Sequence, residues 1–298
     1  EQEPQTDWQA GQYYGGKWGV HLRAPDLWFE LLDRYGERFA PLSQIAELWR
    51  GVTSGKDEFF FPKDASAQCL AKHPDPMDFQ LAYSVPRQEV ESGKVRLVLC
   101  GKGRGEIKPI EARYLEPEVH SLMEVKGFTV RPEDCARMIL LVDKKKEELR
   151  DKHVKAYIEW GEKQNYHKGT TCAARVTAAR EWYDLTGHER GDLFWPMAQQ
   201  YKHAIPSNDH GLIANHNLFD ITGKNVRSSA LGGILNSSFV VISKFQYGRP
   251  VGVEGNLKTE VIDVNMMLVP NPTNAKAKAV ERVAKAFEQM KERPALYF

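Results

Sequence analysis

The chain has 298 residues, of which 42% are hydrophobic and 27% charged, and its formal net charge is +1. These fractions are typical of a globular protein, with enough length for one large domain or two modest ones. No apolar run approaches the roughly 20 residues of a membrane-spanning helix, which predicts a soluble, cytoplasmic protein with no membrane partner. A net charge near zero neither requires nor excludes an anionic partner. A surface that binds nucleic acid would therefore have to come from local clusters of Lys and Arg.

The four cysteines are far apart in the sequence and form no CxxC pair: Cys69, Cys100, Cys135 and Cys172. This spacing predicts buried thiols in a reducing compartment and no zinc site. The first residues, Glu1-Gln2-Glu3-Pro4, and the apolar last residues, Ala295 to Phe298, do not resemble natural ends. We therefore expect a fragment of a longer polypeptide.

A helix is predicted from Pro25-Asp26 to Gly36, with its apolar residues on one face. Next, a strand from Ile45 to Trp49 runs into the turn Gly51-Val52-Thr53-Ser54-Gly55. The two glycines leave backbone N–H groups free, and Arg50 and Lys56 place positive charge on both sides. This turn suits a phosphate or a base edge, but it lacks the Gly-Lys-Thr/Ser ending of a P-loop, so a simple hairpin turn remains the alternative.

Short alternating runs between Phe59 and Ile110 predict irregular antiparallel sheet, with strands at Phe79–Val85 and Val95–Cys100. The basic glycine turn Gly101–Gly105 contains Lys102 and Arg104. It is interpreted as a hairpin loop or, alternatively, as a phosphate contact.

A helical or turn segment is expected from Tyr114, a buried strand over Met138–Val142 and a surface helix over Asp143–Tyr166. The stretch from Lys168 to Tyr183 then combines hydroxyl and guanidinium side chains at short intervals. That composition fits contacts to base edges and phosphates, and it fits equally a loop leading into a strand anchored by Trp182.

Short strands are predicted between Asp192 and Ile221, and a mostly buried helix over Ser228–Ser243, in which Gly232-Gly233 permits close backbone approach. A strand over Val261–Leu268 and a helix over Ala275–Arg293, capped by Thr273 or Asn274, complete the chain. Strands and helices do not alternate. The predicted fold class is therefore α+β, with irregular, mostly antiparallel sheets, flanking helices and a long C-terminal helix.

The order of several segments resembles the C-terminal target-recognition region of TaqI-like N6-adenine DNA methyltransferases of restriction-modification and phage-defence systems. The segments that carry the resemblance are Leu22-Arg23-Ala24-Pro25, Pro41-Leu42, Ile45-Ala46-Glu47, Arg50 to Gly55, Leu115-Glu116-Pro117, Tyr157 to Glu162, Arg180 to Tyr183, Leu235-Asn236-Ser237 and Val269 to Pro272. They span nearly the whole chain. Each is weak alone, and their shared order and spacing make them specific.

The resemblance implies that this chain reads the DNA site while a catalytic domain, in cis or in trans, flips and methylates the adenine. S-adenosylmethionine would be bound by that other domain, because this sequence contains no glycine-rich cofactor loop after a strand and no Asn/Asp-Pro-Pro-Tyr/Phe motif. The expected divisions are a linker and first helix (1–37), a target-recognition domain (38–270) and a C-terminal helix (271–298). The expected partners are double-stranded DNA and the catalytic domain.

Two groups of residues are candidates for DNA contact. Those predicted to hold phosphates are Lys56, Lys102, Arg104, Lys168 and Lys202. Those predicted to contact base edges are Arg50, Thr53, Ser54, Thr170, Thr171, Arg175 and Arg180.

Two rival hypotheses remain. The chain could be a complete enzyme such as a nuclease or hydrolase, although its histidines are scattered and no spacing pairs them with a nucleophile or a carboxylate. It could instead be a protein-interaction module that joins the catalytic and specificity parts of a methyltransferase without binding DNA by itself.

Overall fold

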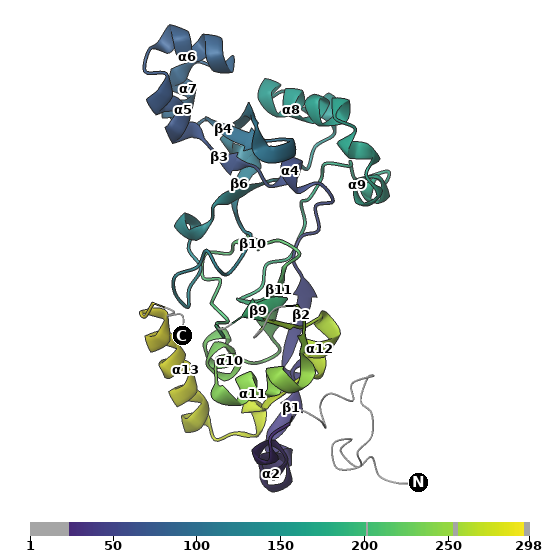
Figure 1. Ribbon diagram of the computed structural model, residues 1–298, viewed down its shortest axis with the longest axis vertical. Helices are drawn as coiled ribbons and strands as arrows, with labels where there is room; N and C mark the ends of the chain where they lie inside the picture. Colours follow the sequence, from purple (N-terminus) through teal and green to yellow (C-terminus); the bar gives the residue numbers. More distant parts are fainter. Residues whose placement is uncertain (1–23, 201, 253–255, 295–298) are drawn as a thin grey trace.

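The computed structural model describes residues 24–200, 202–252 and 256–294. The molecule is elongated, with an upper lobe around β3, β4, α4 and α5–α9, and a lower lobe around β1, β2, β11 and α10–α13 (Figure 1). Strands β6 and β10 lie between them, and β7 pairs with β6. Helices and small, mostly antiparallel sheets are mixed along the chain, which confirms the α+β class. The predicted chain ends and Leu22-Arg23 lie outside the described residues.

The lower lobe is built on an antiparallel sheet in the order β2-β11-β8. Its strands are β2 (Ala46–Arg50), β11 (Leu218–Gly223) and β8 (Leu193–Pro196). Two smaller sheets accompany it: β1 (Phe39–Pro41) with β14 (Leu268–Pro270), and β12 (Arg249–Pro250), β13 (Asn256–Lys258) and β9 (Ala198–Gln200). The lobe's helices are α2 (Asp26–Tyr35), α3 (Leu42–Ile45), α10 (Ser228–Leu235), α11 (Ser238–Tyr247), α12 (Val261–Met266) and α13 (Ala277–Lys291).

Helix α13 packs against α10 at the predicted glycine pair. A Cβ placed on Gly232 would lie 2.3 Å from the ring of Phe287, so only glycine allows this approach. The terminal helix thus covers the core of its own lobe. At the other end of the chain, Trp28 of α2 stacks on Phe239 of α11 at 5.2 Å. Each of these contacts joins residues on opposite sides of a predicted domain boundary. The boundaries themselves stay predictions.

The upper lobe contains the sheet β3-β4-β5, formed by β3 (Lys63–Asp64), β4 (Val95–Cys100) and β5 (Glu106–Glu111). Gly101–Gly105 joins β4 to β5 as the predicted hairpin loop. The helices are α4 (Asp57–Phe60), α5 (Ser66–Lys72), α6 (Pro76–Tyr83), α7 (Arg87–Glu91), α8 (Lys152–Lys163) and α9 (Thr170–Arg175). The intervening sheet is β10 (Ile213–Ala214), β6 (Leu115–Val119) and β7 (Arg137–Leu140), with β10 parallel to β6.

Several predicted elements were wrong. The runs Phe79–Val85 and Val261–Leu268 were predicted as strands, but they form most of helices α6 and α12. The single helix predicted over Ser228–Ser243 is two helices, because Asn236 ends α10 and the Ser237 hydroxyl accepts a hydrogen bond from Val240 N at the start of α11.

Other boundaries shift. The helix predicted over Asp143–Tyr166 begins only at Lys152, and Trp182 lies in a loop rather than a strand. Neither Thr273 nor Asn274 caps α13, whose N-cap position is Lys276 without a side-chain bond.

Lys244 is a lysine buried in the lower lobe, 4% exposed. Its ammonium contacts the side-chain oxygen of Gln199 and lies 4.9 Å from the ring centre of Trp195. Burial lowers the pKa of Lys244 from its ordinary 10.5 to about 7. Between these two values Lys244 binds a proton in the unfolded chain but not in the folded chain, so its contribution to stability should rise with pH from about 7 to 10.5.

We expect Lys244→Met to remove this pH dependence. Urea unfolding should show that the difference in free energy of unfolding, parent minus variant, is about 2 kcal/mol larger at pH 9 than at pH 7. The variant is the reference because burial raises the pKa of all four cysteines, which lowers stability near pH 9 equally in both proteins. At pH 7 the variant should be more stable by about 1 kcal/mol. Removing the buried ammonium group stabilises the protein, and leaving the Gln199 oxygen without its donor partly offsets this stabilisation. The same rise with pH in parent and variant would contradict the assignment to Lys244.

Candidate nucleic-acid interface

The glycine turn is fixed by contacts with a distant loop. Gly51 N donates to Leu218 O at 2.9 Å, and a Cβ on Gly51 would lie 2.2 Å from the carbonyl oxygen of Asn215. Gly55 has a φ of +82°, which favours glycine. The turn leads into the short helix α4 and not into a second strand, so the hairpin alternative is wrong: β2 pairs with β11 instead.

Ser54 has a structural role in this turn. Its side chain is fully buried; the hydroxyl contacts the carboxylate of Asp57 and accepts a hydrogen bond from Lys56 N at 3.1 Å. A base contact by Ser54 would require the turn to open. Thr53, by contrast, is exposed.

Helix α9 lies directly against the turn, although the two are far apart in sequence. Arg175 donates to Thr53 O at 3.1 Å, to Ser54 O at 2.8 Å and to Trp182 O at 2.6 Å. Its guanidinium carbon also lies 5.2 Å from the ring centre of Phe60. Arg175 therefore holds the turn to α9, and burial lowers its pKa. These three hydrogen bonds occupy the guanidinium N–H groups that Arg175 would need for the predicted contact with a base edge.

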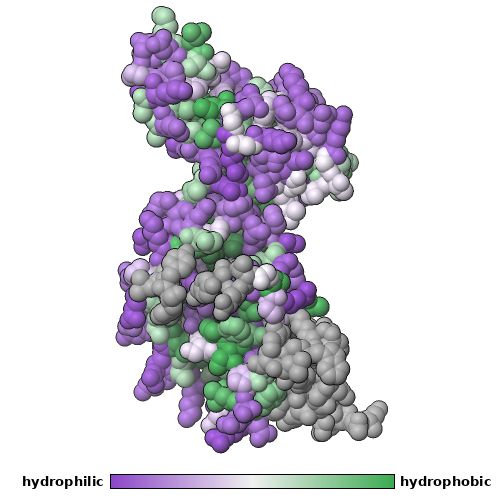
Figure 2. Space-filling view, viewed as in Figure 1, coloured by the Kyte–Doolittle hydropathy of each residue, from purple (hydrophilic) through white to green (hydrophobic). Residues whose placement is uncertain are grey.

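The remaining side chains of the turn and α9 form a surface of hydroxyl and ammonium groups, here called the turn–helix surface. Its members are Thr53, Lys56, Lys168, Thr170 and Thr171, all exposed except Lys56, which is partly buried. The ammonium of Lys56 lies 5.9 Å from the ring centre of Tyr166, and its Cε would be 3.2 Å from a Cβ on Gly169. Figure 2 shows the α9 region as a pale, weakly polar patch above an indentation between the lobes.

An aromatic core supports this surface from behind. Phe59 is fully buried, and its ring centre lies 4.7 Å from that of Tyr157 and 4.9 Å from that of Trp182. Tyr157 also donates its hydroxyl to Phe59 O at 2.7 Å. Trp182 and Trp195 are buried and belong to hydrophobic cores rather than to an exposed stacking platform.

The basic hairpin packs beside α4. Gly101 N donates to Glu58 O at 2.9 Å, and Arg104 donates to Phe61 O at 3.3 Å. Lys102 at the tip is exposed. The hairpin thus lies next to the turn–helix surface, but only Lys102 presents its side chain fully to solvent.

Three predicted contact residues lie apart from this surface. Arg50 is exposed at the end of β2, with its Nε bonded to His216 O at 2.9 Å. Arg180 donates to Asp184 O at 3.1 Å and Thr186 O at 2.8 Å. Lys202 donates to Val125 O at 3.2 Å, and burial lowers its pKa. Their DNA contacts stay predictions.

A polar cluster that the sequence did not predict lies under the glycine turn. Nδ1 of His120 lies 3.2 Å from a carboxylate oxygen of Glu118 and 3.0 Å from Nη1 of Arg137, and it contacts the side-chain amide of Asn215. Burial raises the pKa of Glu118. The only sequence signal was the Glu118/His120 spacing, which places both side chains on one face of β6 and its extension.

Within the described ranges, no cluster of three or more His, Cys, Asp or Glu could hold a metal ion. Cys69, Cys100 and Cys172 are buried free thiols, and Cys135 is partly buried. Among the same residues, no helix has the length and apolar character to span a bilayer.

The geometry is that of an α+β domain with a polar surface built from the glycine turn and α9, and comparison with known proteins identifies its family. Residues 123–297 match the family model of the C-terminal domain of type II methyltransferase M.Eco57I. The match covers more than half of the chain, so the chain belongs to this family. This confirms the resemblance to a C-terminal region of a restriction-modification methyltransferase.

The fold is similar to that of a solved structure, reported as the "Characterization and crystal structure of the type IIG restriction endonuclease BpuSI". The TM-score is 0.51 and the sequence identity 12%, over 94% of this chain and 29% of that chain. The chain thus spans less than a third of the length of BpuSI, and the likeness concerns the fold. No curated protein matches the chain.

Proposed function

We propose that this chain recognises a specific double-stranded DNA sequence as the specificity part of an S-adenosylmethionine-dependent adenine-N6 methyltransferase. The observation that carries the proposal is the turn–helix surface, where Thr53, Thr170 and Thr171 lie beside Lys56 and Lys168 in a chain of the M.Eco57I C-terminal family. Lysines bind phosphates without sequence preference, while hydroxyls can donate to and accept from base edges.

In this proposal, cofactor binding and methyl transfer belong to a catalytic domain in the same polypeptide or in another chain. This chain positions the duplex so that the catalytic domain can extract the target adenine. The turn–helix surface supplies the contacts, and the Arg175 bonds and the Phe59 core fix its shape.

The test is to titrate the purified chain into a labelled randomised duplex pool at low and at moderate salt and to sequence the retained DNA. Enrichment of one short motif, with affinity falling steeply as salt rises, is the expected result. Absence of retention at low salt would overturn autonomous DNA reading. It would favour the second candidate, a module that joins methyltransferase parts through protein contacts.

A further inference from the structure

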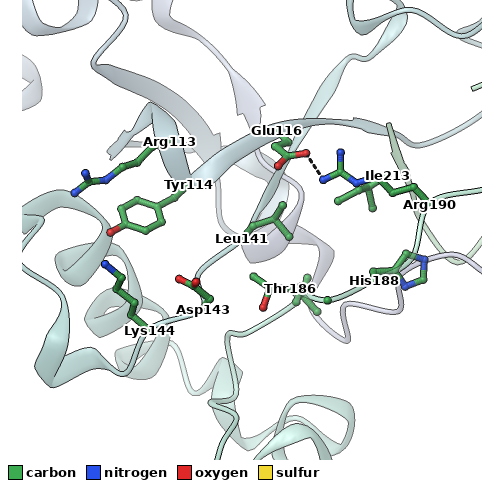
Figure 3. A pocket seen from close by; sticks show the side chains of 12 residues that line it. Arg113, Tyr114, Glu116, Leu141, Asp143, Lys144, Thr186, His188, Arg190 and Ile213 are labelled. Carbon is green, nitrogen blue, oxygen red and sulfur yellow. Dashed lines mark hydrogen bonds and ion pairs between the residues drawn. The ribbon is translucent and has the colours of Figure 1, made fainter. Parts of the chain in front are cut away.

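A second feature, whose residues are distinct from those of the turn–helix surface, lies between the lobes. It is a pocket of about 420 Å³ between β6, the end of β7 and the second half of the segment Trp182–Arg190, here called the 182–190 segment, whose first lining residue is Leu185. A pocket of this size is within the range that holds a small organic ligand. Figure 3 shows two groups of polar side chains around it, Arg113, Tyr114 and Lys144 at one end and Glu116, His188 and Arg190 at the other.

The two ends of the pocket differ in chemistry. At one end, Arg113 and Lys144 lie on either side of the Tyr114 hydroxyl (Figure 3). Arg113 and Tyr114 share the carboxylate of Asp151, with the tyrosine bond at 2.6 Å, whereas Lys144 makes no side-chain bond within the described part of the chain. This end therefore carries a lysine that is available to an anion.

The other end offers both donors and acceptors. Arg190 and Glu116 form an ion pair there at 2.7 Å, and His188 lies beside them (Figure 3). Nε2 of His188 is 3.5 Å from a carboxylate oxygen of the buried Asp220, so this edge of the ring faces the protein. Charged groups of both signs can bond a planar ligand whose edge has donors and acceptors.

An apolar floor connects these ends. Leu141, Leu185 and Ile213 contribute side chains to the lining, and the exposed carboxylate of Asp143 lies between the two ends. A free phosphate would use only the basic end, and an acidic peptide would leave the floor unused. A nucleotide has an anionic phosphate at one end and, at the other, a base with an apolar face and a polar edge.

The 182–190 segment also connects the pocket to the turn–helix surface. Trp182 O accepts from Arg175 at 2.6 Å, and Glu189 O accepts from Trp49 Nε1 at 3.3 Å, next to Arg50 at the end of β2. The segment that lines one wall of the pocket is therefore bonded, at its start, to the arginine that holds the glycine turn to α9.

We infer that this pocket binds one nucleotide unit, with its phosphate between Arg113 and Lys144 and its base on the Leu141–Leu185–Ile213 floor. The inference rests on the proposed function for the source of the nucleotide, which is an extrahelical nucleotide of the bound DNA. Unstacking a base costs a few kcal/mol, and an apolar floor with a polar rim offsets such a cost.

The first test uses the complete chain and isothermal titration with the four deoxynucleoside 5′-monophosphates, the matching nucleosides and inorganic phosphate. At least one monophosphate should bind about tenfold more tightly than phosphate or its own nucleoside, because only the monophosphate occupies both ends. Phosphate binding as tightly as every monophosphate would overturn the nucleotide assignment and leave an anion site only.

Two charge-reversal variants at neighbouring positions test whether the monophosphate binds in this pocket. Lys144→Glu should weaken monophosphate binding about tenfold, because it removes the free cation and adds a repelling charge. Lys145→Glu is the control, since Lys145 is an exposed neighbour that does not line the pocket, and it should bind like the parent. Equal affinities for the two variants, with unchanged thermal unfolding, would overturn the inference.

A second experiment separates this inference from the proposed function. Duplexes carrying 2-aminopurine at successive positions should gain fluorescence at one position with the parent chain and not with Lys144→Glu. Duplex binding without monophosphate binding and without any fluorescence gain would refute the pocket and leave the proposed function standing. Monophosphate binding that is sensitive to Lys144→Glu, without duplex binding, would support the pocket as a site for free nucleotides and refute the proposed function.

Discussion

Replacing Lys56 and Lys168 together by alanine is expected to weaken duplex DNA binding about tenfold at roughly 100 mM salt, whatever the DNA sequence. The two ammonium groups flank the exposed threonines of the turn–helix surface, and neither forms an ion pair within the described residues. If each neutralises one phosphate, the slope of log affinity against log salt should fall by about 2. The measurement is a fluorescence-anisotropy titration at several salt concentrations.

The control for this variant is Lys278→Ala combined with Lys285→Ala. Both lysines are exposed on α13, in the other lobe, so the change in net charge is the same while the turn–helix surface is intact. The control should bind like the parent. Equal losses for both double variants would indicate a general charge effect and would remove the turn–helix surface as the DNA contact.

Local sequence patterns predicted some elements well. Helix α2, strands β2 and β4 and helix α13 each have a clear hydrophobic period bounded by Gly or Pro, and the glycine pair on α10 marks a real close contact. In such segments the local preference for helix or strand agrees with the tertiary packing, so the hydrophobic pattern alone is sufficient to predict the element.

The two strands that proved to be helices show where such patterns fail. Short apolar runs fit either structure, and the deciding signals were at their starts. Asp75 accepts hydrogen bonds from Met77 N and Asp78 N before α6, with Pro76 in the first turn. Glu260 and Asp263 form a capping box at α12. These polar residues predict helix starts that the apolar pattern alone does not reveal.

The candidate site could be predicted only in part. The sequence shows which residue types each segment contains, but it does not show which distant segments come into contact. The sequence marked the glycine turn and the Lys168–Tyr183 stretch separately. It could not show that Thr53 and Arg175, which are 122 positions apart, would be hydrogen-bonded. Nor could it separate exposed hydroxyls such as Thr170 from the buried Ser54, since burial depends on the folded surroundings.

Two roles for Arg175 can be distinguished by experiment. It either contacts DNA bases directly or holds in place the surface that contacts DNA. It donates to three backbone carbonyl groups, of Thr53, Ser54 and Trp182. Arg175→Met should lower the free energy of unfolding by about 3 kcal/mol, because charge-assisted bonds are lost and partly buried carbonyls remain without donors. Arg175→Lys should restore little of this loss, since an ammonium cannot reproduce the planar fork that spans the turn and the 182–190 segment.

The measurement is urea unfolding of both variants, together with DNA selection at a temperature where they remain folded. If Arg175 holds the turn in place, both variants should lose stability and bind DNA more weakly, while the selected motif stays the same. A direct base contact predicts the opposite pattern: near-normal stability and relaxed preference at one base pair, worth about 1–3 kcal/mol of discrimination. That second outcome would require the Arg175 side chain to leave its three carbonyl partners when DNA binds, and it would restore Arg175 as a specificity residue.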